Sequence, residues 1–75
     1  MEYKQYIERN PNIMLGKPII KGTRITVELI MRKFADGYKI VDLIESYPHL
    51  TKEQILAAFE YAADMIANEE TLETA

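Results

Sequence analysis

The chain has 75 residues, a formal net charge of -3 and no cysteine. A chain of this length forms one domain and buries only about 60% of its unfolded surface, so its core is small. Without cysteine there are no disulfides or thiolate metal sites, and the single His49 has no ligand partner at zinc spacing. A partner chain is then the remaining source of extra stability, and a hydrophobic content of 48% leaves apolar surface for it. We expect a homodimer or an obligate complex, without a cofactor.

Charge is divided unevenly along the chain. Residues 1–39 contain eight Lys or Arg against four acidic residues, whereas residues 40–75 contain one basic residue, Lys52, against eight acidic ones. Such a division suits a chain whose halves contact different partners, or each other across a dimer, although solvated helix faces produce it too. No stretch reaches the roughly 18 apolar residues of a membrane span, and residues 1–9 are polar, so we expect a cytoplasmic protein.

Turn residues, cations and β-branched residues are concentrated in residues 16–25. Gly16 and Gly22 allow backbone angles that other residues avoid, and Pro18 fixes φ. The segment therefore predicts two tight corners around a short extended piece.

This extended piece predicts a small hairpin. Residues 18–20 are expected to pair either with residues 23–25 or with residues 13–15, because their β-branched side chains favour a pleated, half-buried backbone. The simpler interpretation of residues 1–25 is a structural clasp over a helical core. The alternative is that the cations of the clasp contact an acidic partner.

Two helical patterns follow the clasp. Thr26 is a candidate N-cap, apolar residues recur after it at helical spacing, and Gly37 suits the left-handed residue that ends a helix. The first helix is therefore expected over residues 27–36. A second apolar pattern covers residues 40–47, and Pro48 forbids its continuation.

A third helix is predicted to begin at a capping box formed by Thr51 and Gln54. Its apolar spacing predicts a buried stripe made of Ile55, Ala58, Phe59, Ala62 and Ile66. Further apolar residues widen this arc beyond what one small core can cover, namely Leu56, Ala63 and Met65. They either form a dimer or partner surface or pack under the clasp.

Together these elements predict a mainly α fold, a three-helix helix-turn-helix bundle with a short N-terminal lead that resembles a β-hairpin. The four-residue link between the second and third helices has the length that this motif requires. The domain is expected to span residues 1–67, with the extended clasp over residues 1–25. Residues 68–75 are acidic and lack periodicity, so we expect this tail to fray.

The third helix is a poor candidate for DNA recognition. Its exposed positions are expected to be Lys52, Glu53 and Gln54, followed by Ala57, Glu60, Tyr61 and Asp64. One lysine among three acidic residues repels phosphates, so DNA binding would need cations from other elements. The candidate DNA-binding residues are Lys21, Arg32, Lys33, Lys39, Lys52 and Gln54.

Residue sets for catalysis are not found in the sequence. Ser46 is the only serine and His49 lies in a turn, so no nucleophile has a matching base. Asp42 and Glu45 lie one helical turn apart, but an exposed carboxylate pair without companion ligands is typical of a solvated face. We therefore expect a binding protein and not an enzyme.

The combination of G-K-P, G-T-R, a D-G turn and Y-P-x-L-T carries a family resemblance. In the order GKPIIKGTRITV and then ADGYKIVDLIESYPHLTKEQILAAFEYA, these motifs resemble the bacterial family known as domain of unknown function number 433, from about residue 13 to residue 63. Members of that family are similar to VapB-type antitoxins. The resemblance implies a homeodomain-like helix-turn-helix domain in a type II toxin-antitoxin pair, with a toxin similar to PIN-domain ribonucleases and autorepression of the operon.

Arg24 is our candidate for blocking the carboxylate centre of such a toxin, because a guanidinium pairs bidentately with carboxylates and stays charged. Gly22 and Thr23 form a corner that can project it, and the alternative is an ion pair with the acidic half of the same chain. The candidate toxin-binding or partner-binding residues are Lys17, Lys21, Arg24, Leu56 and Met65. A DNA-binding protein without a toxin partner, or a purely structural homodimer, remains the alternative function.

Overall fold

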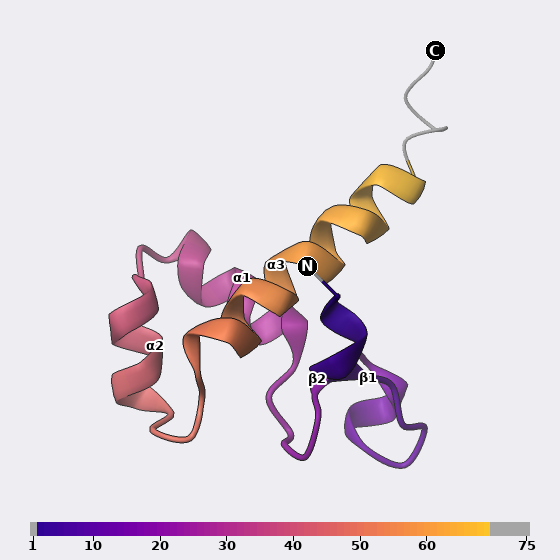
Figure 1. The fold of residues 1–75 in the computed structure, drawn as a ribbon, viewed down its shortest axis with the longest axis horizontal. Helices are drawn as coiled ribbons and strands as arrows, with labels where there is room; N and C mark the ends of the chain where they lie inside the picture. Colours follow the sequence, from indigo (N-terminus) through magenta and orange to yellow (C-terminus); the bar gives the residue numbers. More distant parts are fainter. Residues whose placement is uncertain (1, 70–75) are drawn as a thin grey trace.

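The computed structural model describes residues 2–69, which form a mainly helical fold with a small antiparallel sheet (Figure 1). In chain order the elements are the 3-10 helix η1 (Tyr3–Gln5), β1 (Ile7–Glu8), the 3-10 helix η2 (Met14–Gly16), β2 (Ile19–Ile20), α1 (Val27–Ala35), α2 (Ile40–Ser46) and α3 (Lys52–Asn68). α3 contacts α1, α2, β1 and η1. Among residues 2–69, no helix has both the length and the apolar composition that a membrane crossing requires.

α1 begins at the residue that local chemistry predicts and ends within one residue of the predicted position. The Thr26 Oγ1 accepts a hydrogen bond of 2.9 Å from the Leu29 backbone N–H, which satisfies one of the donors left open at a helix start. Gly37 has a φ of +97°, a left-handed conformation that glycine adopts without a Cβ penalty, and its N–H donates to the Phe34 carbonyl. The predicted N-cap and helix-ending glycine are confirmed, and the helix stops one residue before the predicted end.

α2 and α3 are each fastened at the N-terminus by a side chain three residues inside the cap. The Lys39 N–H donates to the Asp42 carboxylate over 2.7 Å. At α3 the predicted capping box is confirmed, since the Thr51 N–H donates to the Gln54 Oε1 (2.8 Å) and the Gln54 N–H donates to the Thr51 Oγ1 (3.2 Å). α2 ends at Ser46, just before the predicted boundary.

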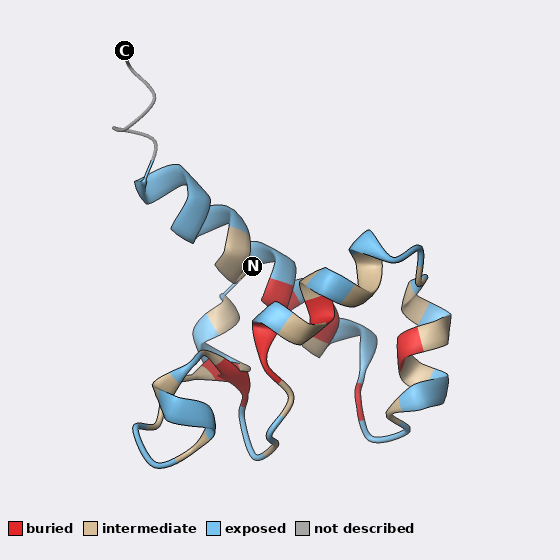
Figure 2. Ribbon diagram, turned by 180° about the vertical axis from the view of Figure 1, so that it is seen from behind, coloured by how far each residue is buried: buried red, intermediate tan, exposed pale blue. Residues whose placement is uncertain are grey.

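The core lies where α3 packs against α1 and α2, with the two strands at its side. Its fully buried side chains include Ile20, Ile30, Leu43, Ile55 and Ala58 (Figure 2). The predicted burial of Phe59 and Ile66 is wrong, because they are 36% and 66% exposed, and the predicted exposure of Ala57 is wrong because it is fully buried. The helix is rotated so that its buried side is centred on Ile55 and Ala58.

The pairing of the clasp differs from both expected hairpins. β2 pairs with β1 in antiparallel register, Ile7 opposite Ile20 and Glu8 opposite Ile19. Residues 13–15 cannot supply a strand, because Met14 and Leu15 have positive φ angles of 50° and 60° and enter η2. Residues 23–25 do not form a strand. Their backbone hydrogen bonds to Ile20 run from the Ile20 N–H to the Ile25 carbonyl and from the Thr23 N–H to the Ile20 carbonyl, and the neighbouring Ile19 forms a single bridge with Thr26.

The N-terminal segment is fastened to α3 by Tyr61. The Tyr61 hydroxyl accepts hydrogen bonds from the Arg9 Nε (3.0 Å) and Nη2 (2.6 Å), and the Tyr61 ring meets the Tyr3 ring edge-on at 5.4 Å. These contacts join residues more than fifty positions apart. The clasp interpretation of this segment therefore has a physical basis in side-chain contacts.

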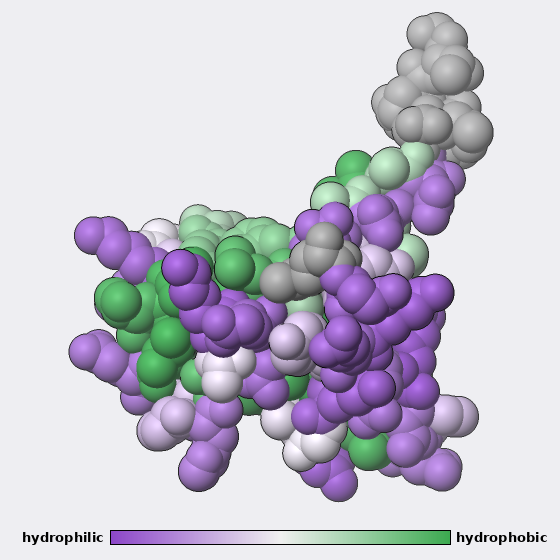
Figure 3. Space-filling model, in the orientation of Figure 1, coloured by the Kyte–Doolittle hydropathy of each residue, from purple (hydrophilic) through white to green (hydrophobic). Residues whose placement is uncertain are grey.

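The C-terminal part of α3 extends past the rest of the molecule (Figure 1), and its residues 63–68 are exposed (Figure 2). Figure 3 shows apolar side chains along one edge of this extension and hydrophilic side chains along the other. The helix includes Asn68, the first residue of the predicted tail, and residues 70–75 lie outside the described part of the chain.

Truncating Leu43 tests the core. Leu43→Ala removes a fully buried side chain and is expected to lower the free energy of unfolding by about 2–5 kcal/mol. Val41→Ala, on the same helix but 60% exposed, is expected to change it by less than about 0.5 kcal/mol. Urea titrations followed by circular dichroism measure both, and equal effects of the two substitutions would contradict this account of the core.

Candidate partner-binding site

The turn between β2 and α1 presents Lys21 and Arg24 to solvent on a hydrogen-bonded frame. Gly22 has a φ of +78°, which the tight corner requires. The Thr23 Oγ1 donates to the Ile20 carbonyl (2.8 Å) and accepts from the Ile25 N–H (3.0 Å), so Thr23 fastens the backbone on both sides of Arg24. The turn is therefore held by side-chain and backbone bonds while its two cations are exposed.

Arg24 makes no ion pair with any residue of the described chain 2–69. The expected alternative, an ion pair with the acidic half of the chain, is not formed within these residues. By contrast Lys17, the third predicted cation of the clasp, is turned toward α1. Its Nζ donates to the Glu28 Oε1 over 3.0 Å, and the Arg32 Nε donates to the Glu28 Oε2 over 3.0 Å.

These two hydrogen bonds lower the pKa of the Glu28 carboxyl below its ordinary value of 4.5, with Lys17 as the larger cause and Arg32 as the second. The three cations of the predicted clasp surface thus differ in role. Lys17 belongs to a surface ion pair that joins the clasp to α1. Lys21 and Arg24 are the ones presented outward.

Beside the Arg24 turn lies a small apolar pocket of about 280 Å³. Thr23 and Ile25 form one wall, and the other is the turn between α2 and α3, comprising Ser46, Tyr47, Pro48, His49 and Leu50. Sequence reasoning missed this pocket, although the G-T-R and Y-P-x-L-T motifs that border it were both recognised. No pattern in either segment alone indicates that they meet in space.

The remaining predicted partner residues, Leu56 and Met65, do not share a surface. Nine residues of an α-helix amount to about two and a half turns, so these side chains lie on opposite sides of α3. Leu56 borders a shallow apolar hollow together with Phe59, Glu60 and Ala63.

Met65 instead lies four residues after Tyr61, on the side of α3 that faces the N-terminal segment. Desolvation is the larger cause that raises the pKa of the Tyr3 hydroxyl, and the carboxylate of Asp64, the neighbour of Met65 in the sequence, raises it further. Leu56 and Met65 therefore lie on different sides of α3, so a single partner surface on this helix does not include both.

The predicted DNA-binding residues are spread over separate elements. Lys21 is in the β2–α1 turn, Arg32 and Lys33 are on α1, Lys39 precedes α2, and Lys52 and Gln54 begin α3. Several of these side chains already have intramolecular partners: Arg32 is paired with Glu28, the Lys33 Nζ lies 4.9 Å from the centre of the Tyr38 ring, and Gln54 is used in the capping box. These residues come from four separate parts of the chain, and three of their side chains already have partners within the molecule.

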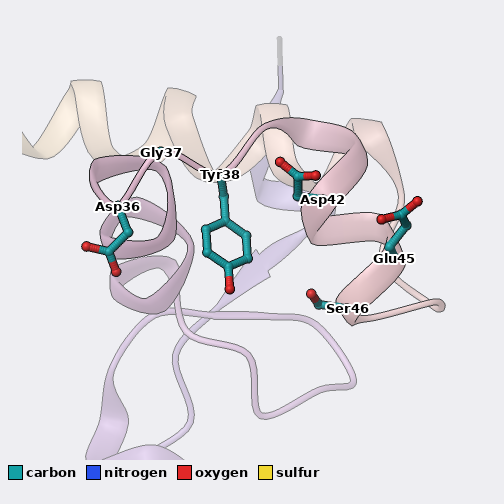
Figure 4. A pocket seen from close by; sticks show the side chains of 6 residues that line it. All are labelled: Asp36, Gly37, Tyr38, Asp42, Glu45 and Ser46. Carbon is teal, nitrogen blue, oxygen red and sulfur yellow. The ribbon is translucent and has the colours of Figure 1, made fainter.

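An open hollow of about 440 Å³ is lined by Asp36, Gly37, Tyr38, Asp42, Glu45 and Ser46 (Figure 4). Figure 4 shows Asp42 and Glu45 on α2, with Tyr38 between them and Asp36. Asp42 already accepts the Lys39 N–H at the start of α2. Within residues 2–69 no group of three acidic, His or Cys side chains is arranged to hold a metal ion.

Residues 7–62 match the family described as "Protein of unknown function (DUF433)". The chain belongs to this family. The matched segment of this DUF433 protein begins in β1 and contains both walls of the apolar pocket as well as the Arg24 turn. It stops at Ala62, so the extension of α3 lies outside it.

The chain is also similar to two longer proteins. It is 30% identical over 59 residues to the uncharacterised protein y4eO of Sinorhizobium fredii, a match that covers 79% of this chain and 27% of that protein. A crystal structure of a DUF433 member from Anabaena variabilis superimposes with a TM-score of 0.76 at 30% identity, covering 89% of this chain and 63% of the other. The chain therefore spans only part of the length of each of these proteins.

A Glu28→Gln variant tests the ion pair that joins the clasp to α1. Because the folded-state pKa is lowered, the carboxylate stabilises the fold fully above its ordinary value of 4.5, and this stabilisation is lost as the pH falls through the lower, folded value. The fall in Tm between neutral pH and about pH 3 should be smaller in Glu28→Gln than in the parent chain. Glu45→Gln, on α2, is the matched control and should keep the parent pH dependence.

Proposed function

We propose that this DUF433 protein is the antitoxin of a type II toxin-antitoxin pair, which binds and inhibits a ribonuclease similar to PIN-domain toxins. The observation that carries the proposal is the Arg24 turn. A guanidinium is held outward on a fastened corner and meets no acidic side chain of residues 2–69. The resemblance of the chain to VapB-type antitoxins supports the same function.

The chemistry of a magnesium-dependent nuclease suits this group. Clustered carboxylates that bind Mg²⁺ attract a guanidinium, which forms bidentate hydrogen bonds with a carboxylate and does not deprotonate at any pH in the cell. Lys21 on the same turn adds a second positive charge, which raises the rate of encounter with an acidic surface. Inhibition then follows from occupation of the carboxylate centre by Arg24.

The apolar pocket gives the contact an anchor beside the charge. Thr23 and Ile25, the immediate neighbours of Arg24, form one of its walls. A partner segment that carries an apolar side chain next to its acidic residues can fill the pocket while its carboxylates meet the guanidinium. Burial of one large aliphatic side chain contributes about 1.5–3 kcal/mol, whereas an exposed charge pair alone contributes little.

Repression of the operon is the second part of the proposal. The order of α1, α2 and α3, with a short turn before α3, suits a homeodomain-like helix-turn-helix, but the exposed Glu53 and Glu60 of α3 disfavour its insertion into the major groove. Contacts to phosphates would come from Lys21 and Lys33. Promoter binding that weakens steeply with salt and is abolished by Lys21→Glu with Lys33→Glu would support this part.

Arg24→Ala tests the inhibition directly. When the variant is titrated into the ribonuclease encoded beside its gene, the concentration for half inhibition should rise about tenfold or more, because a charge-assisted contact is removed. Arg32→Ala is the matched control, since this exposed arginine pairs with Glu28 on α1.

The thermal melt of Arg24→Ala should match that of the parent chain, and Arg32→Ala should lower the Tm only by the small contribution of its exposed pair with Glu28, because neither side chain is buried. Unchanged inhibition by Arg24→Ala, or the same loss for both variants, would contradict the assigned role of Arg24. Failure of the neighbouring gene product to bind the parent chain would contradict the antitoxin function as a whole.

A further inference from the structure

α3 carries a second apolar stripe that the core does not cover. Leu56, Phe59, Ala63 and Ile66 follow one another at spacings of three, four and three residues, which places them on one side of the helix. Leu56 and Phe59 are 37% and 36% exposed, and Ile66 is 66% exposed. The stripe is about 15 Å long, which corresponds to nearly three helical turns.

One residue of the stripe, Phe59, is held in place by the body of the domain, whereas Ile66 lies on an exposed part of α3. The Phe59 ring packs against Phe34 of α1 with centroids 4.7 Å apart, so its position is set by the core side while part of the ring is exposed. Ile66 lies on the extension that passes beyond the body (Figure 1). A short helical extension without packing is only marginally stable in water, so burial of Ile66 by a partner stabilises it.

A row of carboxylates borders this stripe. Glu53, Glu60 and Asp64 are spaced by seven and four residues, which places them along one flank, and all three are exposed; Asp64, at the end of the row, also lies beside the Tyr3 hydroxyl. Both ion pairs found among residues 2–69 involve Glu28, so none of the three is neutralised by a cation there. The stripe thus combines apolar anchors with a line of negative charge.

We propose that this α3 stripe is the binding site for an amphipathic helix of a different protein, with apolar residues at helical spacing and Lys or Arg along one flank. The charge row selects this occupant over a second copy of the chain. In an antiparallel pair of α3 helices, equivalent flanks face each other, so the two acidic rows would repel. In a parallel pair, the acidic flank of one α3 helix would face the opposite flank of the other helix. That opposite flank already packs against the core of its own chain, so it is not accessible.

This inference is independent of the Arg24 surface, which would bind an acidic partner segment. The two sites have opposite charge and separate residues. A domain with both can hold two proteins, or two regions of one protein, at the same time. The helix-binding site can therefore be tested whether or not the antitoxin function holds.

The test uses the full chain and two synthetic helices about three to four turns long, cross-linked to stay helical. Both carry leucines at helical spacing; one has lysines along one flank and its twin has glutamates in the same positions. Fluorescence anisotropy should give the lysine peptide a Kd about tenfold or more below that of the glutamate peptide. Glu53→Lys combined with Glu60→Lys should reverse this preference.

Ile66→Asp and Val41→Asp form the matched pair of variants. Both replace an exposed aliphatic side chain, 66% and 60% exposed, by a carboxylate outside the core. Ile66→Asp should weaken binding of the lysine peptide about tenfold or more, and Val41→Asp should leave it unchanged. Circular dichroism checks that both variants keep the fold.

Three results would overturn the inference. The first is equal binding of the two peptides, or no binding of either, and the second is an equal effect of Ile66→Asp and Val41→Asp. The third is a dimer of the parent chain in sedimentation equilibrium that Ile66→Asp converts to monomer, since the occupant of the stripe would then be a second copy.

Discussion

The packing of one side of α3 on a very small core is the constraint from which the other features follow. Ile55 and Ala58 are fully buried against α1 and α2, where they meet Ile30 and Leu43. A domain of this size has too few residues to cover a helix of 17 residues on more than one side. The apolar stripe on the other side of α3 and the extension beyond the body remain exposed for this reason.

Features that depend on neighbouring residues could be predicted from the sequence. The Thr26 cap, the Thr51–Gln54 capping box and the left-handed Gly37 are each determined within one turn of helix, so all three are confirmed. The strand pairing could not be predicted, because Ile20 could pair with segments nearer in the sequence. It pairs with Ile7 instead, since this pairing buries the Ile7 side chain. At 7% exposure Ile7 belongs to the core, and this gain is a property of the assembled fold.

Only those features of the candidate site that depend on neighbouring residues could be predicted. Gly22 and Thr23 predict that Arg24 stands on a corner, and hydrogen bonds within that corner hold it there. The pocket beside it lies between this corner and the turn around Pro48, about 25 residues further along the chain. A pattern of neighbouring residues does not predict a contact between such distant segments. Which side of α3 faces the core also depends on residues distant in the sequence. A rotation of the helix by the angle of one residue places Ala57 at the edge of the core in place of Phe59.

The charge asymmetry of the sequence is preserved on the folded surface and is not cancelled inside the molecule. Both ion pairs among residues 2–69 join groups of the basic half, since Lys17 and Arg32 share Glu28. The turn that carries Arg24 borders the pocket lined by Leu50, two residues before α3 begins, whereas Ile66 lies about 20 Å along the helix axis from that start. Because the screening length in the cell is about 8 Å, the cationic corner and the acidic flank near Ile66 act as separate electrostatic surfaces. A partner drawn to one of them is therefore neither attracted nor repelled by the far end of the other.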